Sequence, residues 1–559
     1  MSIDRQSVSR RFDAGCRLLK AGQPRKAARE FTAAAELDPD STEILEKLGQ
    51  AQLGCGENAA ALKVYRSLVA LGADTGETWK ILGEIHSRSG DHALAIDAFE
   101  RALKLGGASA ELHHHFGKSL FHLGEIDRAA EQLELAAKDG DRLGPVVSLA
   151  NIIPGAPSAD AKKIMRVRQD SARLLATETP APREAREAVA VDRKANDGRL
   201  RIGYLSAHFH SENYMKPVWA LINRHNRSRF EIHLFSDSPK GQGMPGYLAE
   251  TGDRVHHVAG LDNDTLTQLI SRNGIDVLID LSGYSFPERL GLFLTHPAPV
   301  TVAWFNSFAT SGLPGIDWIV GDDEVVSRRD EKHFTEKVAR LPLSYLTFEV
   351  THEAPPVAPP PCLRNGYITF GSLISQYKIT PPVIEAWAKI LRKTESRLVL
   401  ANTALQSPSN RSWMLKHFVR HGIDPERISL FGPAPHIQFL RHYDRIDIAL
   451  DGFPYNGGTT TMEAIWQGVP VLTPEGDRWA ARTSQTILRR CHLGEFVAGS
   501  VRSMVKQAIK LARDPHTPER LRVLRDEMRS RLEASSACDG TSLARAMETF
   551  FQEASRNRT

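Results

Sequence analysis

The feature that most constrains the fold of this chain is a repeat of 34 residues near its beginning. Each unit is typical of two short helices: a small residue where the helices cross, a Gly at the turn, and an Ala and a larger apolar residue on the inner face of the second helix. Such units bury their apolar faces only against neighbouring units, so the pattern predicts a stacked helical array. The positions that keep the period are Gly15, Gly49, Gly83 and Gly117; Gly22, Gly56, Gly90 and Gly124; Ala27, Ala61, Ala95 and Ala129; and Phe31, Tyr65, Phe99 and Leu133.

The period is that of the tetratricopeptide repeat and differs from those of ankyrin and HEAT arrays. About four repeats over residues 8–140 predict a solenoid whose concave groove commonly holds an extended peptide. A protein partner is therefore expected, and a spacer or dimerisation arm is the alternative. The run His113, His114 and His115 predicts a solvated helix face, because consecutive helical residues point about 100° apart and do not converge on one metal ion.

Composition argues against several other classes of protein. The 559 residues are too many for one core and suggest about three or four domains. With 71 Lys and Arg against 67 Asp and Glu, the net charge of +4 does not indicate a nucleic acid or an anionic membrane as partner. The five scattered cysteines form no C-x-x-C pair, which favours free thiols and argues against zinc. Without an apolar leader or a long apolar segment, the chain is expected to be cytoplasmic.

The chain after the repeats alternates between apolar strand patterns and helical segments. Residues 1–142 hold the repeats, and residues 143–199 predict a helical bridge and a mobile linker. Residues 200–352 and 365–559 each predict a Rossmann-like domain with a parallel sheet, the second followed by C-terminal helices. The proline-rich residues 353–364 are the expected hinge. In such a pair, ligands bind in the cleft between the domains, at the carboxyl ends of the strands.

One loop in the second domain has the composition of a phosphate-binding site. The pattern predicts a strand in "RIDIALDG", a loop in "FPYNGG" and a helix in "TTTMEAIWQ". Gly457 and Gly458 would let backbone N–H groups approach an anion, and Thr459 and Thr460 would add hydroxyls to the unsatisfied donors of the first helical turn. Glu463, one turn deeper, could accept hydrogen bonds from a ribose diol. The alternative is a helix start whose Gly and Thr serve only the turn.

The chain resembles a known family over nearly its whole length. The repeats, the two α/β domains, and the segments "PYNGGTTTMEAIWQGVPVLT", "QYKITP" and "HPAPVTVAWFNSFATSGLPGIDWIVGDD" look like the bacterial SPINDLY-like O-linked N-acetylglucosamine transferases. The resemblance implies an α plus α/β fold, a tetratricopeptide superhelix followed by a GT-B pair of Rossmann-like domains. It also implies an inverting glycosyltransferase that uses a nucleotide sugar, needs no cofactor or bound metal, and modifies Ser or Thr hydroxyls of proteins.

The resemblance assigns donor-side roles residue by residue. The family's phosphate-binding lysine corresponds to Lys378 in "SQYKITP", where a cation would stabilise the charge that grows on the departing diphosphate. Thr459 and Thr460 match the phosphate-side threonines, and Glu463 matches the acidic ribose ligand. The positions that match the family's contacts to the base are Ala434 and His436.

Three positions depart from the family pattern. Gly458 stands where animal relatives have a histidine stacked near the base, which leaves the base preference open. Asn306 stands where the family often has glycine beside the donor sugar, which leaves the identity of the sugar open. Ser375 stands where relatives carry Asn or Gln beside the phosphate.

The acceptor side is expected in "SAHFHSENYMKP", just after the first strand of the first domain. The H-x-x-x-Y spacing makes His210 the counterpart of a family histidine and Tyr214 its neighbour, whereas an ungapped count points to Glu212. We prefer His210, because an imidazole near neutrality can receive the acceptor proton. A substrate phosphate oxygen can do the same, so three candidates for the base stay open. The acids of "GDDEV" are interpreted as loop and helix-start residues rather than metal ligands.

The sequence thus predicts a protein O-glycosyltransferase with protein acceptors and, as donor, UDP-GlcNAc. GDP-fucose and UDP-glucose are alternative donors, because SPINDLY-like relatives differ in this respect. A tetratricopeptide scaffold with a degenerate cleft is the alternative from another class, and a sugar-nucleotide epimerase would not explain the repeats. Neither a nucleic acid nor a membrane is expected as partner, and homodimer formation stays open.

Overall fold

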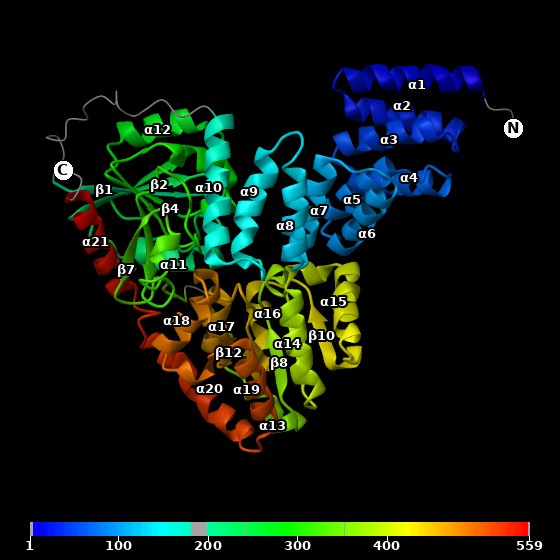
Figure 1. The fold of residues 1–559 in the computed structure, drawn as a ribbon. Coiled ribbons are helices and arrows are strands. Elements are labelled where there is room, and N and C mark those ends of the chain that lie inside the picture. The colour runs from blue at the N-terminus through cyan, green and yellow to red at the C-terminus, as the bar shows by residue number, and fades with distance from the viewer. Residues whose placement is uncertain (1–3, 180–197, 240, 351–352, 557–559) are drawn as a thin grey trace. The chain divides into compact units, whose positions relative to one another are not determined.

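The computed structural model describes residues 4–179, 198–239, 241–350 and 353–556. The chain divides into two compact units, residues 1–142 with 406–414 and residues 143–405 with 415–559. Figure 1 shows helices throughout the N-terminal repeats and alternating strands and helices in the second unit. The expected mobile linker falls on residues 180–197, outside the described residues.

The first unit contains the predicted helix pairs, and the repeated residues explain their packing. A Cβ atom on Gly49 would lie 2.6 Å from the ring of Tyr65, and one on Gly83 would lie 2.5 Å from the ring of Phe99. The two helices of a repeat therefore approach as closely as only glycine allows. The turn glycines take the left-handed conformation, as Gly56 does at φ +76°. The helices are α1 (Arg5–Lys20), α2 (Pro24–Leu37), α3 (Thr42–Gly54), α4 (Asn58–Ala70), α5 (Gly76–Arg88), α6 (His92–Lys104), α7 (Ala110–His122) and α8 (Ile126–Ala136).

The expected solvated histidine face in the fourth repeat is wrong. All three side chains are half-buried, because α7 packs against its neighbouring helices. His113 Nδ1 lies 2.7 Å from Gln132 Oε1, and burial lowers the pKa of His114 to about 4. These histidines therefore contribute to packing between helices.

The second unit begins with the two helices of the expected bridge, α9 (Leu143–Ile152) and α10 (Ala161–Glu178). A seven-stranded parallel sheet follows, in the order β3-β2-β1-β4-β5-β6-β7. Its inner strands are apolar and covered on both faces, so that every residue of β2 is buried, whereas the edge strand β3 is largely exposed. The strands are β1 (Leu200–Ser206), β2 (Phe230–Ser236), β3 (Arg254–His257), β4 (Val277–Asp280), β5 (Val300–Ala303), β6 (Trp318–Asp322) and β7 (Lys337–Leu341), with helices α11 (Glu212–Ile222) and α12 (Asn263–Arg272).

The second α/β domain has a six-stranded sheet in the order β10-β9-β8-β11-β12-β13. Its strand pairs are likewise parallel. The strands are β8 (Thr369–Ser372), β9 (Arg397–Ala401), β10 (Ile428–Phe431), β11 (Ile448–Leu450), β12 (Val471–Pro474) and β13 (Val497–Ala498). The helices are α13 (Cys362–Asn365), α14 (Pro381–Arg392), α15 (Pro408–Arg420), α16 (His436–Leu440), α17 (Thr459–Trp466), α18 (Thr483–Arg490), α19 (Val501–Arg513) and α20 (Thr517–Glu533).

The strand orders place a switch point in each sheet. After β1 the chain builds outward to β2 and β3, and from β4 it builds in the opposite direction. The second sheet switches in the same way between β8 and β11. Loops at the carboxyl ends of such neighbouring strands diverge and leave a crevice, which is where doubly wound sheets bind ligands. The fold thus confirms the predicted pair of Rossmann-like domains.

The last helix, α21 (Gly540–Arg556), returns to the first α/β domain. Glu548 on α21 accepts a hydrogen bond from the backbone N–H of Asn226 and lies 3.0 Å from His225 Nδ1. Trp318 of β6 and Phe550 of α21 stack edge to face, with ring centroids 5.4 Å apart. Residues after the second sheet therefore complete the first domain.

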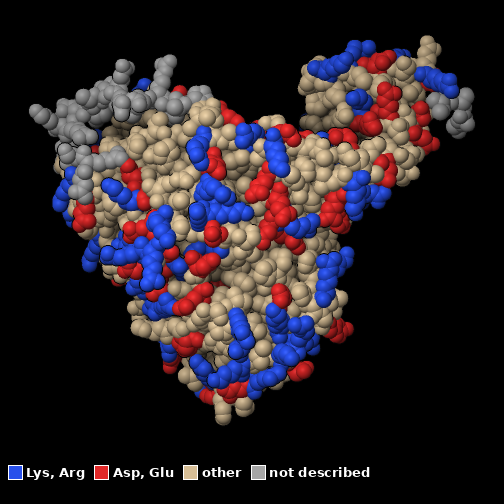
Figure 2. Space-filling model, in the orientation of Figure 1, with Lys and Arg blue, Asp and Glu red and all other residues tan. Residues whose placement is uncertain are grey.

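The surface agrees with the small net charge. On the face shown in Figure 2, basic and acidic side chains are interspersed. Among the described residues, no helix is both long and apolar enough to cross a membrane.

Candidate functional site

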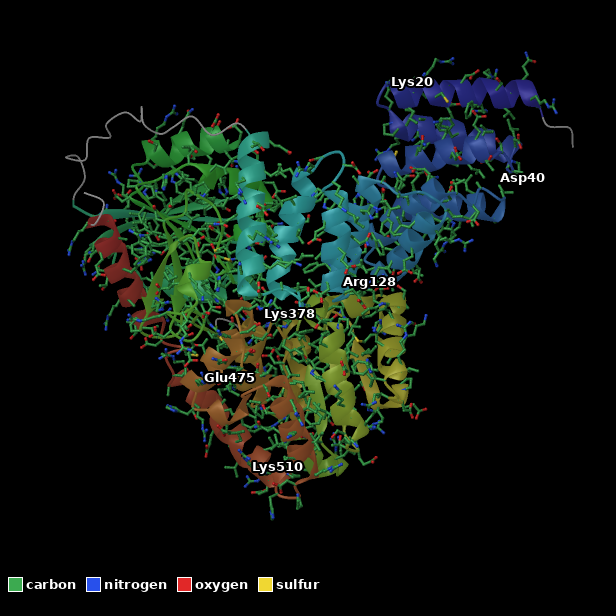
Figure 3. The ribbon with its side chains drawn as sticks, viewed as in Figure 1. Lys20, Asp40, Arg128, Lys378, Glu475 and Lys510 are labelled. Carbon is green, nitrogen blue, oxygen red and sulfur yellow. The ribbon has the colours of Figure 1, made fainter. Side chains whose placement is uncertain are left out.

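Lys378 lies in the loop that leaves β8, at the switch point of the second sheet. Its ammonium Nζ donates a hydrogen bond of 2.8 Å to the carbonyl of Asn456 and lies 4.1 Å from the ring centroid of Tyr455. Burial lowers the pKa of Lys378 to about 8, against the opposing attraction of Asp451. The side chain is half-buried, and Figure 3 marks it near the upper edge of the second domain. A cation held in this way can meet an anion without a large change in its own position.

The loop from β11 to α17 supplies the other side of this position. The buried carboxylate of Asp451 accepts hydrogen bonds from the backbone N–H groups of Gly452 and Gly457, each 2.9 Å long. A Cβ atom on Gly457 would lie only 2.4 Å from the hydroxyl of Thr461. The loop can therefore take this path only with glycine at position 457. A Cβ atom on Gly458, by contrast, would have no neighbour closer than 3.5 Å.

Helix α17 begins directly after this loop and presents donors to it. Its N-cap is Gly458, which has no side chain to cap the helix. The amides of Thr459 and Thr460 have no acceptor within the helix, because they belong to its first turn. Both threonines are half-buried. The amides, the two hydroxyls and the positive end of the helix dipole form a cradle for an anion.

Glu463, the expected ribose ligand, is brought together with His436, the expected base contact. Glu463 Oε1 lies 2.9 Å from His436 Nε2 and 3.7 Å from Nζ of Lys216, which comes from α11 of the first domain. The Lys216 side chain is completely buried, and burial lowers its pKa while Glu463 and Glu212 oppose the shift. Glu463 thus contacts a side chain from each α/β domain, Lys216 of the first and His436 of the second. Lys216 lies within "SAHFHSENYMKP" but is not among the site residues predicted from the sequence.

His210 lies after β1, at the switch point of the first sheet. Its Nδ1 is 3.1 Å from the hydroxyl oxygen of Ser238, and that hydroxyl donates to the carbonyl of Ala207. In the arrangement in which this hydroxyl donates to Ala207, Nδ1 of His210 carries the proton and donates it to Ser238. This tautomer leaves the lone pair on Nε2, where a general base needs it.

Tyr214, the expected neighbour of His210, packs against a different histidine. Its ring meets His208 and Phe305 edge to face, with centroids 5.0 Å away in both cases. His208 Nε2 lies 3.2 Å from the hydroxyl of Ser285, and burial lowers the pKa of His208. Tyr214 therefore packs between the loops that leave β1 and β5, which carry His208 and Phe305.

The loop after β5 carries Asn306 and has an unusual backbone. Asn306 Nδ2 donates to the carbonyl of Ser282, at 3.0 Å, and so joins the loops that leave β5 and β4. Phe305 and Phe308 both take positive φ, at 74° and 53°, a region that bulky residues rarely adopt. The ring of Phe308 lies 5.2 Å from that of Tyr455. This loop therefore contacts the residue that stacks on Lys378.

The remaining expected donor-side positions lie in loops of the second domain. Ala434 is in the loop between β10 and α16 and is half-buried. Ser375 is exposed and precedes the turn that carries Lys378. Neither makes a contact that distinguishes a role in binding from a role in the turn.

The acids of "GDDEV" have structural partners. Asp322 is buried and accepts hydrogen bonds from the backbone N–H groups of Glu324, Val325 and Tyr345. A hydroxyl donor, Thr486, also reaches it. Asp322 is therefore the last residue of β6 rather than a loop residue, and Asp323 and Glu324 lie in the turn that follows, where no helix begins. The lone pairs of Asp322 are used within the protein.

One other cluster has the composition of a cation site. Among the described residues, Glu84, Glu111 and His115 bring their ligand atoms within 4.8 Å of one another. Arg88 pairs with Glu84 at 3.4 Å, and Lys80 pairs with Glu111 at 3.1 Å. Both carboxylates are therefore already neutralised by protein cations, and we assign no metal to them.

Comparison with known proteins agrees with this arrangement. The model of glycosyl transferase family 41 matches residues 183–353 and 362–547. The chain belongs to glycosyl transferase family 41. A tetratricopeptide repeat model matches residues 12–77 and 80–145, so this family 41 chain also carries the predicted repeats.

Family 41 relatives share both the sequence and the fold. Over 366 residues the chain is 31% identical to the "Probable UDP-N-acetylglucosamine–peptide N-acetylglucosaminyltransferase SPINDLY" of Oryza sativa subsp. japonica, covering 64% of this chain and 39% of that protein. It is 23% identical over 436 residues to the UDP-N-acetylglucosamine–peptide N-acetylglucosaminyltransferase of Caenorhabditis elegans, covering 57% and 38%. A solved mutant of the Thermobaculum terrenum O-GlcNAc transferase aligns over 100% of both chains, with a TM-score of 0.75 and 28% identity. The chain spans about two fifths of the length of the curated relatives it matches.

Proposed function

We propose that this family 41 chain is an inverting protein O-glycosyltransferase that moves N-acetylglucosamine from UDP-GlcNAc to Ser or Thr hydroxyls. The observation that carries the proposal is the hydrogen bond from Lys378 to Asn456, in the loop that leads into the glycine–threonine start of α17 at the switch point of the second sheet. A cation and a set of backbone donors converge there, as a diphosphate leaving group requires. The names of the matched relatives support the choice of UDP-GlcNAc and of protein acceptors.

The reaction would proceed in one displacement. The acceptor hydroxyl oxygen attacks the anomeric carbon from the face opposite the diphosphate, and the bond from that carbon to the diphosphate oxygen breaks. The negative charge that develops on the leaving oxygen is stabilised by Lys378 and by the donors of Thr459 and Thr460. The hydroxyl proton passes to His210 Nε2, to Glu212 or to a phosphate oxygen. The charge balance needs no bound metal, because the protein supplies the cation.

The groups near Glu463 would hold the nucleoside. Its carboxylate, which lies beside Lys216 and His436, would accept hydrogen bonds from the ribose hydroxyls. The loop with Ala434 and the open position at Gly458 would border the base, and Asn306 would border the sugar. The tetratricopeptide groove would bind the flexible protein segment that contains the acceptor hydroxyl.

Ligand-dependent stabilisation of the purified chain is the first test. Thermal unfolding is measured with UDP, GDP, UDP-GlcNAc, UDP-glucose and GDP-fucose, since a ligand that binds only the folded state raises the midpoint. The proposal expects UDP and UDP-GlcNAc to raise it and the GDP ligands to leave it unchanged. A selective shift with GDP-fucose would replace the proposed donor. No shift with any ligand, confirmed by calorimetry at millimolar concentration, would overturn the enzymatic proposal.

Transfer of radiolabelled sugar to protein acceptors is the second test. Lys378→Met is expected to keep the fold and lose about 100-fold or more in kcat, the usual effect of removing one donor to a developing anion. Lys389→Met is the matched control, because Lys389 is exposed on α14 and pairs with Glu385 in the same helix. Equal activity of the two variants would remove Lys378 from the reaction.

A further inference from the structure

Arg168, on α10, is a buried cation that does not belong to the site described above. Only 3% of its surface is exposed, yet all of its hydrogen bonds to described residues are donated to backbone carbonyls. Nε donates to Ala150 at 3.1 Å. Nη1 reaches Ser307, Ala309 and Thr310 at 3.2, 3.3 and 2.7 Å. Among the described residues, no carboxylate pairs with this guanidinium, and burying an unpaired guanidinium is energetically costly.

The three carbonyls that Nη1 binds belong to the loop that follows β5. Two further contacts attach this loop to the same place. The guanidinium lies over the ring of Tyr284, 4.4 Å from its centroid, and the Tyr284 hydroxyl donates to the carbonyl of Ser311 at 2.8 Å. Gly312, at φ +72°, packs so closely on α10 that a Cβ atom would lie 2.7 Å from the backbone of Arg168. Residues 307–312 are thus fixed from one side by Arg168 and its surroundings.

The same loop contains the strained Phe308. Left-handed backbone at a bulky residue persists only where its surroundings hold it, and the carbonyls on both sides of Phe308, those of Ser307 and Ala309, are bound to Arg168. The Phe308 ring then rests on Tyr455, and Tyr455 lies against the ammonium of Lys378. A continuous path of contacts therefore leads from Arg168 to the proposed leaving-group cation.

We propose that Arg168 is a positioning residue of the donor site, which fixes Phe308 against Tyr455 and so keeps Tyr455 packed over Lys378. The inference rests on the proposed function of Lys378. Helix α10 would then support the transfer reaction, although no atom of Arg168 needs to touch the substrate. Removing Arg168 would leave three loop carbonyls without their donor, release the left-handed turn and admit water beside Lys378.

The test compares Arg168→Met and Arg168→Lys with Arg525→Met in the full chain. Arg525 is an equally buried arginine, 2% exposed, that also donates to carbonyls, those of Ala358 and Ile446. Ile446 precedes β11 at its amino end, away from the switch point. The control therefore reproduces the loss of a buried arginine without the path to Lys378.

We expect Arg168→Met and Arg525→Met to lower the midpoint of thermal unfolding alike. At a temperature well below both midpoints, Arg168→Met should lose about 10- to 100-fold in kcat, with the KM for donor within about threefold of wild type. Arg525→Met should stay within about twofold in both, and Arg168→Lys should lie between Arg168→Met and wild type. Equal kcat for Arg168→Met and Arg525→Met would overturn the proposal. Arg168→Lys carries the test if Arg168→Met does not fold.

The second readout is independent of transfer. The lysines are ¹³C-methylated, the Lys378 signal is assigned from its absence in Lys378→Arg, and its titration is followed by NMR. Exposure to water should move the Lys378 midpoint upward from about 8 in Arg168→Met and leave it in place in Arg525→Met. An unchanged midpoint in Arg168→Met would refute the positioning role. If the wild-type chain transfers no sugar at all, the proposed function fails, and this titration still decides whether Arg168 controls Lys378.

Discussion

The shifted pKa of Lys378 predicts where transfer should fail as the pH rises. Burial lowers it from the usual 10.5 to about 8. In the free enzyme, about nine tenths of the side chains are then charged at pH 7 and about one tenth at pH 9. If only the charged form stabilises the leaving diphosphate, kcat/KM falls about tenfold between these two pH values and by about tenfold for each further pH unit. An unperturbed lysine would leave kcat/KM flat over the same range.

Two further consequences arise from the same shift. A bound diphosphate is anionic and raises the pKa of Lys378, so the alkaline fall in kcat should lie at higher pH than the fall in kcat/KM. The contribution of Lys378 to the free energy of unfolding changes with pH in the opposite sense. Between pH 8 and 10.5 the unfolded chain binds more protons at this lysine than the folded chain, so its contribution to stability increases with pH. Loss of activity above pH 8 is therefore not loss of the fold through this group.

Initial rates with radiolabelled donor, at constant ionic strength from pH 6.5 to 9.5, measure the effect. The matched variant is Lys378→Arg, because a guanidinium stays charged throughout this range. Its activity should be lower than that of wild type at pH 7, but its profile should show no alkaline fall below pH 9.5. An identical alkaline fall in wild type and Lys378→Arg would refute the reasoning, since another group would then be responsible. So would a flat wild-type profile.

Two more predictions concern the nucleotide side. Gly457→Ala would place its new Cβ atom 2.4 Å from the Thr461 hydroxyl. It should weaken UDP binding at least about tenfold by calorimetry, because the donors of the cradle are displaced. A Cβ atom on Gly458 has 3.5 Å of space, so Gly458→Ala should change the affinity by less than about threefold, and equal effects of the two variants would contradict the close packing at position 457. Lys216→Met removes the buried lysine that lies beside the Glu463 carboxylate and should lower the free energy of unfolding by about 1–3 kcal/mol in denaturant titrations. Glu463→Gln should restore part of this loss in the double variant, and simple additivity of the two losses would contradict the coupling.

The sequence predicts the fold wherever the contacts lie close together along the chain. Gly49 and Tyr65 are 16 positions apart, and the 34-residue period repeats this pair, so the packing of each helix pair can be inferred from the spacing alone. Lys378 and Thr459 lie far apart in the sequence, but each comes after an apolar strand and part of the loop that leaves it. The carboxyl ends of parallel strands meet at one edge of a sheet. Their convergence is implied by the strand pattern before any coordinate is known.

Lys216 is harder to predict for a physical reason. A lysine on an amphipathic helix is ordinarily solvated, and nothing adjacent to it in the sequence indicates otherwise. It is buried because Glu463, 247 positions later, faces it from the other α/β domain. The sequence contains both partners but no local sign that they meet.

The contacts of Arg168 also show where the chain divides into domains. Composition separates residues 143–199 from the first α/β domain, because Ala, Arg and Pro give way at residue 200 to an apolar strand. Contacts divide the chain elsewhere, since residues from Leu143 onward belong to the α/β unit. A boundary drawn at residue 200 would separate Arg168 from the carbonyls of Ser307, Ala309 and Thr310 that it binds. A helix identified by composition as a connector is, by its contacts, the support of the loop that lies against Tyr455.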